Sequence, residues 1–247
     1  MVPTTLTNAL DEKPFLVEVS KSYEEAGFDI YLVGGAVRDG ILGIATKDFD
    51  FTTNASPEDS LELLCNKGYK TTEIGKAFGT IETTIEECSL HITTYREDTY
   101  DKDSRKPEVK TSRNLDKDLS RRDFTINALA YDMNKNEIID PHNGLKDLSE
   151  GILRTPDSPN ISFSDDPLRM LRACRFISTH GFTPNSEVFE AITKNLERIQ
   201  IVSTERIRDE FTKLLTGENP SLGIKAFVES GLSQRIMPEL DELKIEV

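Results

Sequence analysis

The segment from Tyr31 to Phe51 combines a short apolar run, a pair of glycines and two aspartates separated by one phenylalanine. Side chains two residues apart in a β-strand point to the same side, so Asp48 and Asp50 are expected to project together. Phe49 and Phe51 then point to the opposite side, into a core. The segment therefore predicts a strand with one acidic face and one buried face.

Two adjacent carboxylates are suited to hard divalent cations. Mg²⁺ takes one or two carboxylates in proteins, and water and substrate phosphates complete its shell. Two such ions stabilise both the attacking and the leaving oxygen of a phosphoryl displacement. An exposed D-x-D pair is also common without any ligand, so the neighbouring residues decide between a metal site and a solvated pair.

The residues before the aspartates favour a phosphate site. Ile30–Val33 is a short apolar run with β-branched residues, which predicts a strand. Gly34 and Gly35 follow it and let the backbone approach a ligand closely. A helix is expected from Ala36 onward, and the free amides at a helix N-terminus bind anions. Arg38, in the first turn, is then expected to hold a triphosphate oxygen.

A second group of polar residues lies in SRRDFTINALAYD, residues 120–132. Ser120 is expected to cap a helix. Arg122 and Asp123 at its start suit a phosphate and a ribose hydroxyl, because arginine offers a fixed fork of donors and aspartate accepts from a hydroxyl. The apolar residues that this helix would bury are Phe124, Ala128 and Tyr131.

A third group lies in SDDPLRMLRACRF, residues 164–176, where Ser164 is the expected helix cap. Asp166, Arg169 and Arg172 follow at intervals of three and are expected to share a face. A surface ion pair accounts for this spacing and contributes only a few tenths of a kcal/mol. The same pair also presents an acceptor and donors to a base edge. Cytosine and adenine match it through an exocyclic amine, whereas uracil and guanine carry a carbonyl there.

The periodicity predicts an α/β half followed by a helical half. We place the boundary at 157, where prolines and serines interrupt the pattern, which gives domains 1–157 and 158–247. From Ser164 onward no convincing strand is expected. The elements expected in the first half are helices at Phe15–Ala26 and Pro57–Lys67 and strands at Tyr69–Glu73, Gly79–Ile85 and Ser89–Tyr95.

The motifs GGAVRD, DFD, RRDFTINA and DDPLR, in this order, resemble the class II tRNA nucleotidyltransferases and bacterial poly(A) polymerases of the DNA polymerase β superfamily. The resemblance extends from about Phe15 to Leu240. It implies an α/β nucleotidyltransferase head, with a mixed sheet and helices, followed by an all-α neck that reads the nucleobase. Asp48 and Asp50 match the metal-binding carboxylates of the family, which binds two Mg²⁺ ions.

The resemblance implies template-independent addition of CMP and AMP, from CTP and ATP, to the 3′ end of tRNA. Poly(A) polymerase and partial CC-adding or A-adding enzymes stay open as alternatives, and so does a catalytically silent nucleotide- or RNA-binding module. The residues expected to bind the nucleotide are Gly34, Gly35, Arg38, Arg122, Asp123, Asp166, Arg169 and Arg172. Arg206 and Glu210 are expected to form a supporting i,i+4 pair.

Two departures from the family pattern limit these expectations. His91, in LHITTYR, stands where family members often carry a glutamate. Either the two aspartates suffice or Glu82 on the adjacent strand assists, and the expected consequence is reduced activity or an altered metal preference. The chain also stops where full-length members continue into body and tail domains that bind tRNA. Either the chain is a fragment of such a protein, or it is a naturally short head-and-neck enzyme that relies on a homodimer, a partner protein or a shorter primer.

The net charge of −14 disfavours nucleic acid as a partner, but basic residues outnumber acidic ones between Asp101 and Arg122. Arg105 and Lys106 in this segment are candidate RNA contacts. No apolar run reaches the length of a membrane span, and the N-terminus lacks the features of a secretory signal. A soluble, cytoplasmic enzyme is therefore expected. The three cysteines are widely spaced and indicate neither a disulfide framework nor a zinc site.

Overall fold

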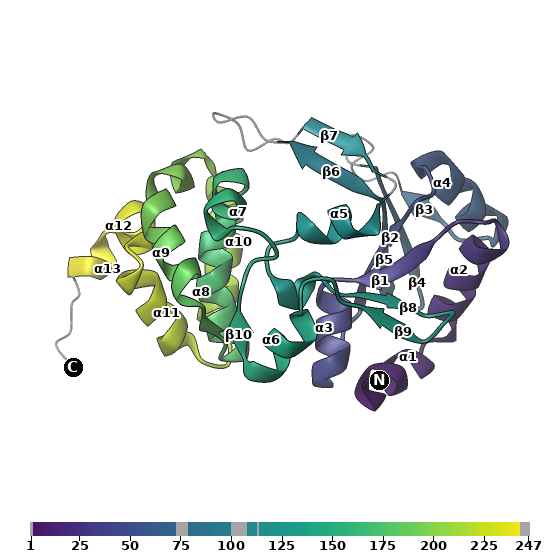
Figure 1. The fold of residues 1–247 in the computed structure, drawn as a ribbon, viewed down its shortest axis with the longest axis horizontal. Coiled ribbons are helices and arrows are strands. Elements are labelled where there is room, and N and C mark those ends of the chain that lie inside the picture. The colour runs from purple at the N-terminus through teal and green to yellow at the C-terminus, as the bar shows by residue number, and fades with distance from the viewer. Residues whose placement is uncertain (1, 73–78, 100–107, 113, 243–247) are drawn as a thin grey trace. The chain divides into compact units, whose positions relative to one another are not determined.

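The computed structural model of the chain has two compact units (Figure 1). It describes residues 2–72, 79–99, 108–112 and 114–242. Unit 1 comprises Met1–Asp98 and Val109–Leu145, and unit 2 comprises Thr99–Glu108 and Lys146–Val247. The chain thus leaves unit 1 earlier than residue 157, and a functional boundary at 157 stays a prediction.

Unit 1 is built on a seven-stranded mixed sheet with the order β3-β4-β5-β2-β1-β8-β9 (Figure 1). β2 and β5 are parallel, whereas β1 pairs antiparallel with both β2 and β8. This sheet and its helices confirm the predicted α/β head. The strands span Ile30–Val33 (β1), Asp48–Thr53 (β2), Thr71–Thr72 (β3), Thr80–Ile85 (β4), Cys88–Thr94 (β5), Ala130–Asp132 (β8) and Glu137–Ile139 (β9).

One face of the sheet carries the main core of unit 1, which it shares with four helices. Phe49 and Phe51 of β2 lie in this core with Leu90 and Ile92 of β5, which confirms the predicted orientation of the two phenylalanines. Burial of such side chains is the main stabilising contribution to this face. The four helices span Thr4–Asp11 (α1), Pro14–Glu25 (α2), Gly35–Leu42 (α3) and Pro57–Asn66 (α4).

Local signals in the sequence set the ends of these helices. α4 begins at Pro57 after a capping box, in which Ser56 and Asp59 bond to each other's backbone amides. The chain after α2 turns at Gly27, whose φ of +83° is readily accessible only to glycine. The predicted helices at 15–26 and 57–67 are confirmed to within one or two residues.

The opposite face of the sheet is covered by α5, which spans Leu115–Ser120. Leu119 of this helix packs with Val33, Ala128 and Ala130 in a smaller apolar cluster. Asp48 and Asp50 are exposed on β2. A hydrogen bond from Thr52 of β2 to Asp118 of α5 holds this helix beside the strand that carries the predicted metal-binding carboxylates (Figure 1).

The helix predicted from Ser120 to Tyr131 is wrong. Ser120 ends α5, a 3₁₀ turn spans Thr125–Asn127, and β8 begins at Ala130. Two interactions override the helical spacing. The Asp123 carboxylate accepts hydrogen bonds from the Phe124 amide and from Asn127, which fixes a turn. The β8 strand then pairs with β1, and strand pairing of this kind outweighs local propensity.

A two-stranded ribbon follows the main sheet and consists of β6, Arg96–Thr99, and β7, Glu108–Thr111. Residues 100–107 lie outside the described residues. The expected RNA contacts of Arg105 and Lys106 therefore stay predictions.

Unit 2 is mainly helical and confirms the predicted change of fold type. α8 packs against both α10 and α11. A short parallel pair, β10 at Ile152–Leu153 and β11 at Thr183–Pro184, corrects the expectation of no strand after Ser164. The helices span Gly144–Glu150 (α6), Pro159–Asp165 (α7), Leu168–His180 (α8), Ser186–Asn195 (α9), Thr204–Leu215 (α10), Pro220–Glu229 (α11), Leu232–Ile236 (α12) and Glu239–Glu242 (α13), with a 3₁₀ helix at Leu196–Ile201.

The predicted helix start at Ser164 is also wrong, because two helices meet there. Ser164 lies inside α7, and α8 begins only at Leu168. Pro167 lacks an amide hydrogen and excludes helical backbone at the residue before it, and Asp166 is indeed extended. Asp166 then caps α8 by accepting a hydrogen bond from the Leu168 amide at 3.2 Å.

Candidate active site

Asp48 and Asp50 stand at the beginning of β2, in the centre of the sheet of unit 1. The exposure along β2 alternates, with both aspartates exposed and Phe49 buried between them. The two carboxylates therefore project from one face of the sheet, as the sequence predicted. Charged groups that lie this close repel each other unless a cation is bound between them.

Gly34 joins β1 to α3 beside the second of these carboxylates, Asp50. Its backbone has φ +69° and ψ −135°, a conformation that is essentially restricted to glycine. A Cβ atom on Gly34 would lie 3.1 Å from Arg122 Nη1 and 3.9 Å from Asp50 Oδ2. The structure thus brings together three residues that the sequence assigned to one site from separate motifs. Because glycine has no Cβ, the position beside this guanidinium and this carboxylate holds no side-chain atom.

Filling this position should impair nucleotide binding. We expect Gly34→Ala to destabilise the fold by about 1–3 kcal/mol because of its backbone conformation. We also expect CTP to bind roughly tenfold more weakly or worse, because the new methyl group displaces Arg122. Urea unfolding and calorimetric titration with CTP measure the two effects separately.

Gly27→Ala is the matched control for this substitution. Gly27 also has a positive φ, but a Cβ there would meet no atom within 4 Å. This variant should lose about 1 kcal/mol of stability and bind CTP as the wild type does. Equal CTP affinity in the two variants would contradict a nucleotide site at Gly34.

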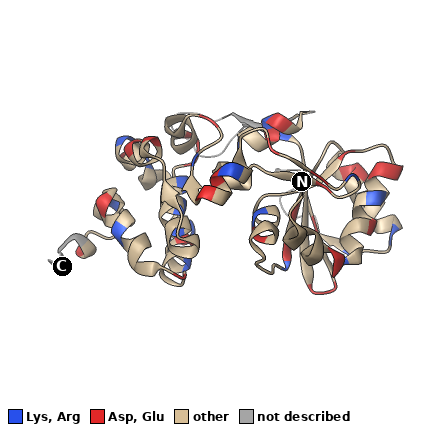
Figure 2. Cartoon of the chain, turned by 60° about the horizontal axis from the view of Figure 1, so that its bottom comes forward, with Lys and Arg blue, Asp and Glu red and all other residues tan. Residues whose placement is uncertain are grey.

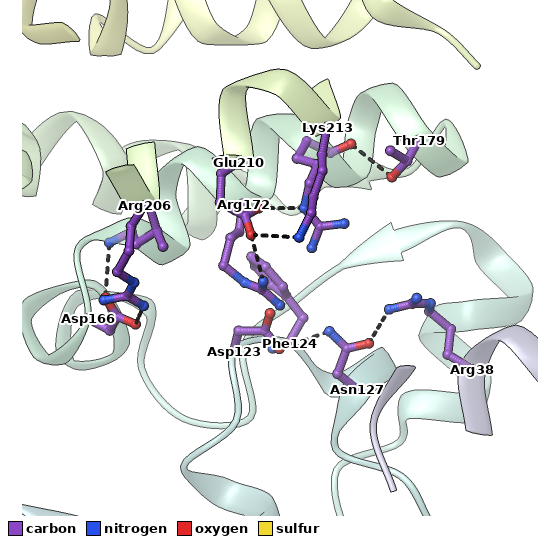
Figure 3. Close-up of polar contacts among 12 residues, drawn as sticks. Arg38, Asp123, Phe124, Asn127, Asp166, Arg172, Thr179, Arg206, Glu210 and Lys213 are labelled. Carbon is purple, nitrogen blue, oxygen red and sulfur yellow. Dashed lines mark hydrogen bonds and ion pairs between the residues drawn. The ribbon is translucent and has the colours of Figure 1, made fainter. Parts of the chain in front are cut away.

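Arg38, expected at a triphosphate oxygen, is buried in α3 and makes contacts within unit 1. Its Nη1 donates to Asn127 Oδ1, and its Nη2 lies 2.7 Å from Asp39 Oδ1. Asn127 in turn donates to Asp123 Oδ1 at 2.9 Å (Figure 3). Arg38 therefore supports the turn that presents Asp123, and direct phosphate contact by Arg38 stays a prediction.

The sequence reasoning missed Asp118, which lies in α5 and is completely buried. It forms ion pairs with Arg121 at 2.8 Å and Arg122 at 3.1 Å. Burial opposes the charge of Asp118, but the two guanidiniums outweigh burial and lower the pKa of its carboxyl below the ordinary value. The spacing of three and four residues to the arginines was the available signal.

His91 lies on β5 directly opposite Asp50 and also opposite Glu82 of β4. Its Nδ1 is 3.5 Å from Asp50 Oδ1, and its Nε2 is 3.5 Å from Glu82 Oε1. The hydrogen bond to Asp50 raises the pKa of His91, burial lowers it, and the charges of Asp50, Glu82 and Asp48 raise it further. The imidazole of His91 therefore lies between the carboxylates of Asp50 and Glu82.

Unit 2 contains the residues that the sequence assigned to base reading, at the start of α8. The second oxygen of Asp166, Oδ2, accepts a hydrogen bond from Arg206 Nη2 at 3.1 Å (Figure 3). Arg169 donates to Ser162 Oγ at 2.8 Å. Asp166 precedes α8, whereas Arg169 lies within it, so the two do not occupy one continuous helical face.

The predicted i,i+4 pair between Arg206 and Glu210 is not formed. Arg206 pairs with Asp166, and Glu210 pairs with arginines of α8 and, within α10, with Lys213. Glu210 is buried and accepts hydrogen bonds from Arg172 at 3.2 Å and from Arg175 at 2.6 Å (Figure 3). Arg175 also lies 4.0 Å from the centre of the Phe176 ring. Arg172 is thereby fixed on α8 by a buried carboxylate, which the i,i+4 rule cannot detect.

The acidic net charge is spread over both units. Figure 2 shows Asp and Glu residues in both units of the described chain, with Lys and Arg residues between them. No helix among the described residues is both long and apolar enough to cross a membrane. The described part of the chain also contains no group of three or more His, Cys, Asp and Glu side chains arranged to hold a metal ion.

A magnesium site nevertheless fits the residues at the start of β2. Mg²⁺ needs only one or two protein carboxylates when phosphate oxygens complete its shell. Asp48 and Asp50 offer two exposed carboxylates, and Gly34 lies beside Asp50 and Arg122. The donors are oxygens, which Mg²⁺ prefers, with one imidazole nearby.

Comparisons with known proteins show the family of the chain. The family described as "Poly A polymerase head domain" matches residues 30–154, and the one described as "Probable RNA and SrmB- binding site of polymerase A" matches residues 181–244. A CCA-adding enzyme of Ligilactobacillus salivarius (strain UCC118) is 40% identical over 226 residues, which are 91% of this chain and 55% of that protein.

Two solved structures are similar over almost the whole chain. The crystal structure of the Bacillus stearothermophilus CCA-adding enzyme in complex with CTP has a TM-score of 0.80 and 34% identity, covering 91% of this chain and 53% of that one. The Thermotoga maritima CCA-adding enzyme complexed with tRNA also has a TM-score of 0.80, with 28% identity, covering 96% and 55%.

The chain spans about half the length of the curated relatives that it matches. The head-domain match includes the two aspartates, Asp48 and Asp50, together with Gly34 and Arg122. The head-domain match alone covers half of the chain. The chain therefore belongs to the poly A polymerase head domain family, the class II tRNA nucleotidyltransferases and bacterial poly(A) polymerases that its motifs resemble.

Proposed function

We propose that the protein is a template-independent nucleotidyltransferase that adds CMP and AMP, from CTP and ATP, to the 3′ end of tRNA. The observation that carries this proposal is the convergence of Asp50, Gly34 and Arg122 at the start of β2. A carboxylate and a guanidinium beside a glycine backbone suit a metal-bound triphosphate. The Bacillus relative bound to CTP and the Thermotoga relative bound to tRNA support the choice of substrates.

The residues of unit 1 have separate roles in this reaction. Asp48 and Asp50 would hold two Mg²⁺ ions, and Arg122 binds the triphosphate through its free donors. The chemistry that the bound ions supply is activation of the primer's 3′ hydroxyl and neutralisation of the pyrophosphate. Asp123, held in its turn by Asn127, accepts from a ribose hydroxyl. Gly35 leaves the start of α3 open to the phosphates.

In unit 2, Asp166 and Arg169 select the base. Each carboxylate oxygen of Asp166 has more than one lone pair, so its contacts to Leu168 and Arg206 leave capacity for the amine of cytosine or adenine. Arg169 donates to a ring nitrogen. Arg172 is held by the buried Glu210 and completes the nucleotide-binding side chains.

Poly(A) polymerase is the second candidate, because the matching family is described by that activity. The two activities differ in the product and share the site. We expect incubation with tRNA lacking its 3′ CCA, together with CTP, ATP and Mg²⁺, to yield molecules that end in CCA. Sequencing of the product ends is the measurement. A long A tail would replace the proposal with poly(A) polymerase, and a stop after CC would replace it with the partial enzyme.

A further inference from the structure

Asp118 links the metal-binding strand to an arginine of the site. Its Oδ2 accepts from Thr52 Oγ1 and from Arg122 Nη2, both at 3.1 Å. Thr52 lies on β2 two residues after Asp50, on the same face of the strand. The other oxygen of Asp118, Oδ1, accepts from Arg121 at 2.8 Å and from the Arg96 amide at 3.4 Å. One buried carboxylate therefore joins α5, β2 and the start of β6.

Arg122 uses only part of its hydrogen-bonding capacity in these contacts. A guanidinium has five N–H donors, and buried donors are nearly always paired. Among the described residues, however, Arg122 Nε is buried and has no hydrogen-bond partner. Arg122 Nη1 and Asp50 Oδ2 both lie within 4 Å of the position that a Cβ on Gly34 would take. The unsatisfied Nε leaves Arg122 with a donor that an anionic ligand can use.

We propose that Asp118 is a positioning residue, which holds the Arg122 guanidinium beside Asp50 so that its remaining donors face the triphosphate. This inference rests on the proposed function and deepens it. Asp118 is too buried to contact substrate, so it acts only through Arg122. A guanidinium fixed in advance binds phosphate better than a mobile one, because less side-chain entropy is lost on binding.

Asp118→Asn tests this role, because it keeps the shape of the side chain and removes one acceptor. The amide group then places a donor against a guanidinium, so at least one of the two arginines loses its partner. We expect CTP to bind about tenfold more weakly, the range found for residues that orient a ligand's direct contacts. CMP, which lacks the outer phosphates, should bind within about twofold of the wild type. Isothermal titration with CTP and with CMP gives both affinities.

Asp132→Asn is the matched control. Asp132 is also buried in unit 1 and paired with a cation, Lys135 at 2.9 Å, but it belongs to β8 and its turn. This variant should lose stability without changing the ratio of CTP to CMP affinity. Combining Asp118→Asn with Arg122→Gln should weaken CTP binding no further than Arg122→Gln alone, because the first residue acts through the second.

Thr52→Val provides a milder test if Asp118→Asn does not fold. It removes the hydroxyl that bonds Asp118 and retains both ion pairs, so CTP binding should weaken roughly threefold and CMP binding should not change. An unchanged ratio of CTP to CMP affinity in the folded variants would overturn the role of Asp118 and leave the proposed function standing. A wild-type protein that binds CTP no more tightly than CMP would instead overturn the proposed function.

Discussion

Asp50→Ala is expected to abolish nucleotide incorporation while the protein stays folded. The side chain is more than half exposed and lies on the polar face of β2, so its removal creates no cavity in the core. Losing one of two carboxylates removes several kcal/mol of transition-state stabilisation, which corresponds to roughly a thousandfold in rate. Incorporation of radiolabelled CMP into a primer measures the rate, and a thermal melt measures the fold.

Asp11→Ala is the control for this experiment, since Asp11 is an exposed aspartate at the end of α1, remote in sequence from the motifs of the site. It should retain both the melt and the rate. Incorporation by Asp50→Ala within about tenfold of the Asp11→Ala rate would exclude Asp50 as a metal-binding residue.

Asp166→Asn is expected to change which bases are accepted. The asparagine oxygen can still cap α8 through the Leu168 amide, so the start of the helix is preserved. Its amide nitrogen donates where the carboxylate accepted, and it therefore matches the carbonyl of uracil or guanine. One hydrogen bond involving a charged group is worth roughly 1.5–3 kcal/mol, or about ten- to a hundred-and-fifty-fold in selectivity.

The ratio of CTP to UTP incorporation measures this change, and it should fall in Asp166→Asn. Asp209→Asn on α10 is the matched control, because Asp209 is exposed and pairs with the neighbouring Arg208 of its own helix. Its ratio should equal that of the wild type. Retained activity with an unchanged ratio in Asp166→Asn would leave Asp166 as a helix cap and remove it from base selection.

The sheet of unit 1 was predictable because its strands carry their signals locally. Phe49 and Phe51 alternate with two aspartates, and this alternation fixed the buried face of β2 without reference to any other segment. The structure that follows Ser120, a turn and then β8 in place of the expected helix, was not predictable in this way. The β8 strand exists because it pairs with β1, a contact between residues nearly a hundred positions apart, which no local pattern contains.

The same distinction separates the site residues that were found from those that were missed. Asp50, Gly34 and Arg122 belong to short motifs, and the structure brings them together. Asp118 is buried by the fold itself, and its importance appears only when its contacts to β2 are known. In unit 2, Pro167 was the overlooked local signal, since the residue before a proline disfavours helix.

His91 shows a limit of reading single motifs. The sequence revealed a histidine in place of a glutamate and suggested that Glu82 assists. The register of β4, β5 and β2 places Glu82, His91 and Asp50 in one row across the sheet. The imidazole of His91 thus contacts Glu82 on one side and Asp50 on the other. This arrangement follows from strand register and not from spacing along the chain.

Pyrophosphate release is the most direct test of the central claim that Asp48 and Asp50 form a catalytic metal site. The wild-type protein, incubated with an RNA primer, CTP, ATP and Mg²⁺, should release pyrophosphate continuously, and a chelator of divalent cations should stop the release. UTP or GTP in place of CTP and ATP should give little release. A protein that binds CTP but releases no pyrophosphate under these conditions would contradict the claim and identify a catalytically silent nucleotide-binding module.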